Sequence, residues 1–458
     1  MAQVFNWTGF YAGVNVGGGV GRNRTNFNNP VGVPLENETT YMSPAGIIGG
    51  VQIGYNVQFQ NFYNLVLGVE ADFQGSGQKG SACLATCVAA GTTSLNVQQN
   101  IDWFGTVRGR AGFATGSVFS YFTGGLAYGN VNTSGSLVGA GVPGLPFSFG
   151  ETRTGYVIGS GVEASLGGKW TAKVEYLYVD LGTSSASIAT TGNAAAAGFF
   201  GNPVNATSRV RDNIFRAGLN YGIGSNTAEV APANWSGFYV GGNFGSQVAR
   251  NQSTYNINPV AAFGVGSAEQ FSLMPDGYAG GLQIGYNWQA GAWVYGLEAD
   301  FQGSTSKDNR SCLIACTPGN GTAAYNQTIP YFGTVRGRLG YSVGSTLFYG
   351  TGGFAYGRTK TDIAENGFLG SQDFSFKDSK SGYAVGGGIE SPLQFAGLFG
   401  PSWTVKAEYL FVDLGSTSNS FVSVPLSGGT DTFTTRTQVH NFRTGINYHF
   451  NAPVVAKY

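Results

Sequence analysis

The chain has 458 residues, about three times the commonest domain size, so it is too long to be one small domain. Only 10% of the residues are charged, against roughly 25% in an ordinary soluble protein, and 24 basic residues cancel 24 acidic ones. Together with 75 glycines and 14% aromatic residues, these figures exclude intrinsic disorder, collagen and a basic nucleic-acid-binding face.

The N-terminal residues Met1–Gln3 run directly into the first apolar segment, with no basic region and no apolar targeting region. We expect an exported protein, and in that case the signal peptide is absent from this chain. No run of about 18 apolar residues predicts a membrane helix. A β-barrel that faces lipid outside and holds polar groups inside tolerates this composition.

Eight segments of strand character, each bounded by turn residues, follow in the first half of the chain. Each is close to the 9–11 residues that cross a bilayer as a tilted strand. The predicted strands lie near 9–20, 45–57, 65–74, 102–114, 118–130, 152–165, 170–181 and 210–221.

The connections between these segments alternate in length. Long connections rich in Ser, Thr, Asn and Gly follow the odd-numbered strands, and short ones such as 115–117 and 167–169 follow strands four and six. Long extracellular loops and short periplasmic turns are typical of outer-membrane barrels. We expect both chain termini at the periplasmic end.

The whole pattern then occurs a second time. Asn6–Tyr11 returns as Asn234–Tyr239, an offset of 234 − 6 = 228, and Trp103–Arg110 returns as Tyr331–Arg338 at the same offset. This period is too long for a solenoid and indicates a duplicated domain. The second set of predicted strands lies near 237–245, 278–288, 294–302, 331–342, 346–358, 380–390, 403–414 and 438–450.

Alternation along the strands separates an apolar face from a charged face. Val107 opposes Arg108 in one strand, for example, and Asp102 shares the charged face there. In a soluble sandwich the charged face would meet water, but the few charges of this chain are concentrated on strands. We predict that they pair inside a membrane barrel. The predicted lumen ion pairs involve Glu70, Asp72, Arg108, Arg110, Lys173, Glu175, Arg216, Glu298, Asp300, Arg336, Arg338, Lys406, Glu408 and Arg443.

Tryptophans occur at the ends of several predicted strands and fit the aromatic girdles of a membrane barrel. These residues are Trp7, Trp103, Trp170, Trp235 and Trp403.

Four cysteines form two pairs with equal spacing, Cys83 with Cys87 and Cys312 with Cys316, in the second long loop of each copy. An even count in an exported protein favours one disulfide within each loop. The spacing is not the Cys-x-x-Cys of redox catalysis, and without nearby histidines a metal site is not expected. We expect no cofactor.

An enzymatic function is not predicted. The chain has two histidines, His440 and His449, both in the last strand, so the first copy has no Ser-His-Asp arrangement. Glu70 and Glu175 could suggest paired catalytic carboxylates, but their basic neighbours favour ion pairs.

Three blocks in each copy resemble the alphaproteobacterial outer-membrane β-barrel family, which contains porin-like major surface antigens and some haemin-binding relatives. In the first copy these blocks are Asn6–Gly13, Asp102–Arg110 and Val174–Gly182. The resemblance implies an eight-stranded antiparallel up-and-down transmembrane barrel per copy and a location in the outer membrane of a Gram-negative bacterium. The closing residues Gly445, Tyr448 and Phe450 resemble the aromatic-ended last strand that the barrel-assembly machinery recognises.

Two architectures remain open: two tandem eight-stranded barrels, or one sixteen-stranded barrel. Side chains can fill an eight-stranded barrel, so charges of both signs inside favour two barrels. We expect barrels at residues 1–224 and 234–458, joined by a periplasmic linker at 225–233.

The primary functional hypothesis is a structural, surface-exposed outer-membrane protein with filled barrels and long extracellular loops. The alternatives are a passive porin for small hydrophilic solutes and a receptor that binds haemin or another surface ligand through its loops. The expected partners are outer-membrane lipid, lipopolysaccharide and the barrel-assembly machinery, with no nucleic acid.

Overall fold

The computed structural model describes residues 5–28, 37–85, 94–139, 142–188, 204–223, 233–257, 267–310, 322–367, 370–393, 399–425 and 428–450. All regular elements within these ranges are β-strands. No described segment is a helix long and apolar enough to cross a membrane.

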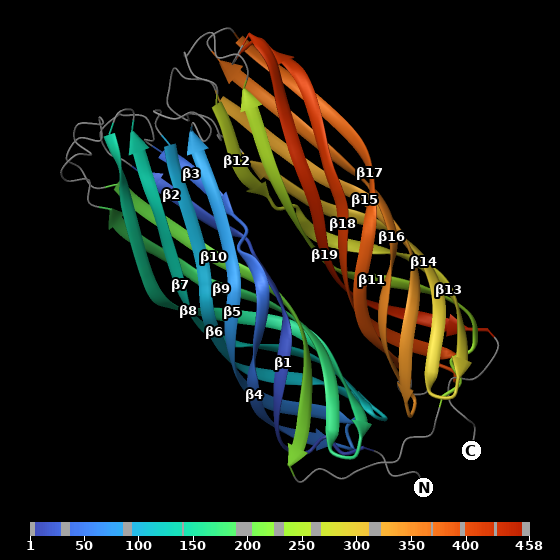
Figure 1. Ribbon diagram of the computed structural model, residues 1–458. Coiled ribbons are helices and arrows are strands. Elements are labelled where there is room, and N and C mark those ends of the chain that lie inside the picture. Colours follow the sequence, from blue (N-terminus) through green and yellow to red (C-terminus); the bar gives the residue numbers. More distant parts are fainter. Residues whose placement is uncertain are drawn as a thin grey trace.

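The first ten strands form one closed antiparallel barrel (Figure 1). β1 and β2 are successive parts of the first barrel strand, and β3 and β4, which Pro44 separates, are parts of the second. β1 pairs with β4 on one side and with β10 on the other, which closes the ring. The bounds are β1 (Gly9–Gly21), β2 (Asn23–Asn28), β3 (Asn37–Met42), β4 (Ala45–Phe59), β5 (Leu65–Ala85), β6 (Ser94–Thr115), β7 (Val118–Gly139), β8 (Val142–Gly167), β9 (Trp170–Ile188) and β10 (Val204–Ile223).

The remaining nine strands form a second barrel of the same design. β11 pairs with β13 on one side and with β19 on the other, and Pro275 separates β12 from β13 as Pro44 separates β3 from β4. The bounds are β11 (Gly237–Ile257), β12 (Ser267–Leu273), β13 (Asp276–Ala290), β14 (Trp293–Arg310), β15 (Thr322–Val343), β16 (Thr346–Gly367), β17 (Gly370–Pro392), β18 (Trp403–Ser423) and β19 (Gly429–His449).

Because the eighth strand of each copy pairs with the first strand of the same copy, the chain forms two eight-stranded barrels, and the sixteen-stranded alternative is wrong. The barrels lie side by side with both termini at the same end, where the turns are short (Figure 1). One of these turns contains Gly116 at φ +60°, a conformation that glycine adopts without strain.

The strands are much longer than the sequence predicts, and several predicted loops are wrong. β5 continues to Ala85 rather than ending near residue 74, and only residues 140–141 separate β7 from β8. Cys83 therefore lies in a strand, paired with Asn96 of β6, and not in a loop. Beyond the bilayer both faces of a hairpin can be polar, so the apolar alternation that marks a strand disappears while backbone pairing continues.

The outer surface of both barrels carries a belt of exposed apolar side chains. Ile47, Phe122 and Leu282 each have about three quarters of their surface exposed, at 75%, 78% and 74%. On β16 the outward residues then change from Phe354 and Tyr356 to the charged Arg358, Lys360 and Asp362. A continuous belt of exposed apolar side chains marks the surface that lipid covers. The change to charged residues marks the extracellular edge of this belt.

Part of this outer surface is covered by the other barrel instead of lipid. Phe215 of β10 points away from the lumen but is only 4% exposed, because its ring lies 4.9 Å from that of Tyr409 on β18. Val162 and Ala164 of β8 likewise pack against Ile389 of β17. Strand alternation places Phe215 on the face opposite the inward Arg216, but the sequence does not reveal where two apolar outer faces meet each other.

Candidate functional site

The most highly organised polar site in each barrel is a cluster of ionised side chains inside the lumen. In the first barrel Glu70 on β5 lies directly opposite Arg108 on β6, and Glu175 on β9 lies directly opposite Arg216 on β10. Because every second residue of a strand points inward, cross-strand partners of opposite charge meet in the lumen.

The contacts of this first cluster extend across the lumen as well as between neighbouring strands. Arg108 contacts Glu70, Asp72 at 3.0 Å and Glu175 at 2.9 Å. Lys173 Nζ lies 2.8 Å from Glu70 Oε1, and Arg216 Nη2 lies 2.8 Å from Asp72 Oδ2. Each charge is thus shared among several partners, the arrangement that a buried ion pair needs to offset its desolvation.

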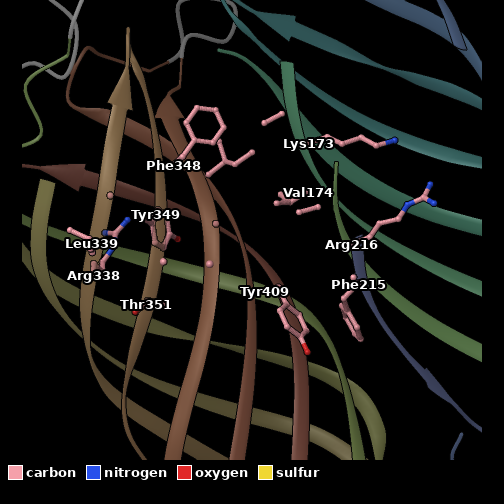
Figure 2. Close-up of a pocket in the computed structure, with 18 of the residues that line it drawn as sticks. Lys173, Val174, Phe215, Arg216, Arg338, Leu339, Phe348, Tyr349, Thr351 and Tyr409 are labelled. Carbon is pink, nitrogen blue, oxygen red and sulfur yellow. The ribbon is translucent and has the colours of Figure 1, made fainter. Parts of the chain in front are cut away.

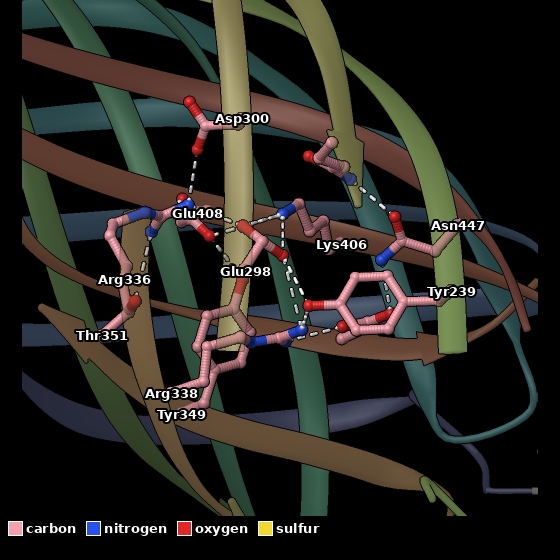
Figure 3. Close-up of polar contacts among 12 residues, drawn as sticks. Tyr239, Glu298, Asp300, Arg336, Arg338, Tyr349, Thr351, Lys406, Glu408 and Asn447 are labelled. Atoms are coloured by element: carbon pink, nitrogen blue, oxygen red, sulfur yellow. Dashed lines mark hydrogen bonds and ion pairs between the residues drawn. The ribbon is translucent and has the colours of Figure 1, made fainter. Parts of the chain in front are cut away.

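The second barrel repeats the cluster with the same geometry (Figure 3). Arg336 Nη1 lies 3.1 Å from Glu408 Oε1, and Arg336 Nη2 lies 2.6 Å from Glu298 Oε1. Arg443 Nη2 lies 2.9 Å from Asp300 Oδ2, and Lys406 Nζ lies 3.0 Å from Glu298 Oε1. The two copies therefore hold their charges in equivalent ways.

One acidic residue of each cluster was missed from the sequence. Glu163 on β8 lies 2.5 Å from Arg110, and Glu390 on β17 lies 2.7 Å from Arg338. With Glu163 the first cluster has four basic residues (Arg108, Arg110, Lys173 and Arg216) and four acidic ones (Glu70, Asp72, Glu163 and Glu175). Glu390 balances the second cluster in the same way. The signal was present, because Glu163 and Glu390 are the only acidic residues at inward positions of the predicted strands 152–165 and 380–390.

Tyrosines that sequence reasoning also missed complete both clusters. Tyr11 donates a hydrogen bond to Glu70 at 2.7 Å, and Tyr239 donates one to Glu298 at 2.9 Å. The guanidinium of Arg110 stacks 4.0 Å from the ring centre of Tyr121, as that of Arg338 does on Tyr349. The hydroxyls donate to carboxylate acceptors, and the ring faces attract the guanidinium cations.

Apolar layers enclose the clusters on their extracellular side. In the first barrel inward residues such as Ile101, Phe104, Leu177 and Ile214 form one buried core, and in the second barrel Phe332 and Leu410 belong to the equivalent layer. A water-filled channel through these described residues would leave their side chains exposed, yet all of these are at most 2% exposed.

The periplasmic mouths are closed by the segments that precede the first strands. Trp7 packs inside the first barrel with Phe119, and Trp235 packs inside the second with Leu347 and Tyr349. They are 5% and 0% exposed, so their assignment to an interfacial girdle is wrong. Trp170, at 45% exposed, does lie on the outer face.

One inward assignment was also wrong. Asp102 is exposed on the outer face, where it accepts a hydrogen bond from Asn132. The register of β6 with β7 shifts between Ile101 and Trp103. A bulge of this kind inserts one residue and reverses the facing of the residues beyond it, which strict alternation cannot anticipate.

A family model described as "Outer membrane protein beta-barrel domain" matches the chain twice, over residues 2–222 and 222–450. Each match covers one copy of the repeat. The chain belongs to the outer-membrane β-barrel family. It is located in the bacterial outer membrane, as the resemblance implies.

Two curated relatives are each similar to less than half of this chain. A 31 kDa outer-membrane immunogenic protein of Brucella melitensis is 39% identical over 190 residues, which cover 39% of this chain and 73% of the relative. A 22 kDa outer membrane protein of Rhizobium leguminosarum is 32% identical over 207 residues, covering 44% and 76%. Among solved structures, a Pseudomonas aeruginosa FadL homologue is 12% identical over 97% of this chain and 91% of its own, with a TM-score of 0.28.

The two histidines considered for catalysis contact side chains of the barrel walls. His440 faces outward between the barrels, 2.8 Å from the Tyr409 hydroxyl, and His449 lies 3.4 Å from Glu390. No group of three or more His, Cys, Asp or Glu side chains in the described part of the chain could hold a metal. Cys87, Cys312 and Cys316 lie outside the described residues, so both loop disulfides stay predictions.

Proposed function

We propose that this outer-membrane protein is a structural surface protein whose two barrels are closed, and not a channel. The observation that carries the proposal is the burial of the lumen charges. The side chains of Arg108, Glu70 and Glu175 have no exposed surface, and neither do those of Arg336, Glu298 and Glu408. Ions cannot pass where the charged groups fill the lumen and leave no surface that solvent can reach.

The long hairpins support a role at the cell surface. β6, β7, β15 and β16 each have 22 residues, about twice the 9–11 that cross a bilayer. The excess lies at the end opposite the termini, which is the extracellular end of such barrels. The immunogenic outer-membrane relative from Brucella is consistent with exposed, antigenic hairpins here.

Conductance in planar bilayers tests the closed lumen. The purified chain, shown to be folded by its heat-modifiable mobility on gels, is expected to give no stable steps on the nanosiemens scale. Stable steps of that size would establish the passive porin instead. Haemin titration followed by absorbance is expected to show no saturable spectral change, and a saturable change would establish a ligand receptor.

Surface exposure has its own test. Antibodies against the β7–β8 hairpin are expected to label intact cells, because this hairpin projects beyond the apolar belt. Antibodies against the periplasmic segment that contains Trp7 are expected to label only permeabilised cells. Labelling of intact cells by the second antibody would contradict the proposed orientation.

Several partner and boundary assignments belong to the same proposal. Outer-membrane lipid and lipopolysaccharide would surround the apolar belt, and residues 225–233 would form a periplasmic linker. Recognition by the barrel-assembly machinery would use Gly445, Tyr448 and Phe450. In support, Tyr448 and Phe450 lie on the outer face of the final strand segment, at 36% and 57% exposed.

A further inference from the structure

A cavity of about 1080 Å³ lies between the two barrels (Figure 2). Its first wall comes from outward residues of β1, β9 and β10, such as Val16, Val174 and Ala217. Its second wall comes from β14 to β19 and includes Leu339, Phe348 and Phe442. The outer faces of both barrels, which would otherwise meet lipid, therefore line one shared space.

The charged residues along these walls do not offer polar groups to the cavity. Lys173 and Arg216 point away from it into the first barrel (Figure 2), where both are held in the ion cluster without exposed surface. Arg338 is bound in the second cluster by Glu390. What the cavity presents is the apolar side chains and the glycine backbone of the two walls. Such a lining offers water few hydrogen-bond partners.

The cavity lies in the periplasmic half of the membrane. Trp293 begins β14 and Tyr341 is close to the end of β15, both beside short periplasmic turns. On the extracellular side the ring of Phe215 packs on Tyr409, and Tyr176 stacks on Phe442 at 5.8 Å. This aromatic contact closes the cavity toward the outer leaflet.

The two lateral edges of the cavity, where the walls of the two barrels approach each other, differ. On one side Val162 and Ala164 of β8 touch Ile389 and Ala407 directly, so the barrels meet there. On the other side Val16 is 59% exposed and Trp293 is 48% exposed, and both lie at the outer apolar surface. The cavity is thus closed on one side and open to the lipid phase on the other.

We propose that this cavity binds an acyl chain of a phospholipid from the periplasmic leaflet. Such a chain has the apolar character that the lining requires, and it reaches the cavity from the adjacent leaflet without crossing a polar layer. The cavity volume of about 1080 Å³ slightly exceeds the roughly 300–1,000 Å³ usual for a binding site, so the cavity can hold a long flexible chain. The bound lipid would complete the contact between the barrels where their side chains do not meet.

Native mass spectrometry of the full chain, extracted in a mild detergent and exchanged into a second one, tests this proposal. The parent protein is expected to retain about one phospholipid per chain. Ala217→Trp, which places an indole in the cavity, is expected to reduce that occupancy at least about fivefold. Ala217→Leu, a smaller change, is expected to reduce it partially, so the test does not depend on one variant.

Ala111→Trp is the matched control. Ala111 also lies on the outer face of the first barrel near the periplasmic end, on β6, but it does not line the cavity. This variant is expected to keep the lipid and the parent's heat-modifiable mobility. Loss of the lipid in both tryptophan variants, retention in both, or retained lipopolysaccharide in place of phospholipid would overturn the proposal. The test is independent of whether the barrels conduct ions.

Discussion

Arg108 on β6 donates a hydrogen bond from Nη1 to Glu175 Oε1 on β9, 2.9 Å away, although β7 and β8 lie between these strands in the wall. The contact therefore crosses the lumen and joins separate parts of the barrel. Removal of Arg108 would leave acidic neighbours buried without their main shared cation, a situation that is strongly destabilising.

Arg108→Ala is expected to lower the free energy of unfolding of the first barrel by about 3–5 kcal/mol, the usual loss when one partner of a buried ion pair is removed. Val107→Ala is the control, because Val107 is adjacent, faces outward and is 53% exposed. Its loss is expected to be about 0.5 kcal/mol. The temperature at which each variant loses its folded mobility on gels measures both losses of stability. Equal decreases in this temperature for the two variants would contradict the inward assignment of Arg108.

The blocks that recur at an offset of 228 were enough to predict the duplication, and strand alternation was enough to predict the inward direction of residues such as Glu70 and Arg336. Strand alternation failed to predict features that do not repeat every two residues along a strand. The bulge near Asp102 reverses facing locally, and the hairpins beyond the bilayer lack an apolar face to mark them. The contact of Phe215 with Tyr409 depends on how two closed barrels pack, which no pattern within one copy encodes.

Trp7→Ala is expected to destabilise the first barrel by about 3–5 kcal/mol, the range for truncating a buried tryptophan. The indole of Trp7 packs against Phe5 and Phe119 inside the periplasmic mouth, with ring centres 4.7 and 5.5 Å away. Trp170→Ala, on the lipid-facing surface, is expected to have a smaller effect because lipid can replace the lost contacts. Thermal unfolding followed by tryptophan fluorescence and gel mobility compares them. A larger loss at Trp170 would show that Trp7 does not close the mouth.

Arg22→Ala is expected to loosen the extracellular contact between the barrels. Arg22, between β1 and β2, lies 2.8 Å from Asp276 and 3.4 Å from Asp308 of the second barrel. A partly exposed pair of this kind contributes about 1 kcal/mol at most, or roughly a fivefold change in local opening. Hydrogen exchange of β12, which pairs with β5 beside this contact, is expected to quicken by that factor. Arg358→Ala, at a partly exposed outward position on β16, is the control, and equal quickening of exchange in both variants would refute the role of Arg22.

The extracellular end of the second barrel is expected to respond to pH through Glu365. This carboxyl lies beyond the apolar belt of β16, accepts hydrogen bonds from Tyr255 and, at 2.6 Å, from Ser423, and has no exposed surface. Burial raises the pKa of Glu365 above its ordinary value of 4.5. The folded protein therefore binds this proton more tightly than the unfolded chain, so stability falls as the pH rises from about 4.5 through the raised value.

Glu365→Gln carries no charge at any pH. Its amide oxygen replaces one of the two carboxylate oxygens that accept from Tyr255 and Ser423, and its amide NH2 replaces the other, so this change in hydrogen bonding does not depend on pH. The melting temperature of the variant minus that of the parent is therefore expected to rise between pH 4 and pH 8, by an amount that levels off above the native pKa. Asp362→Asn, on the exposed face of the same strand and 2.8 Å from Lys360, is expected to show no such rise. A difference between Glu365→Gln and the parent that stays constant or falls across this range would mean that Glu365 is not forced toward its protonated form by burial.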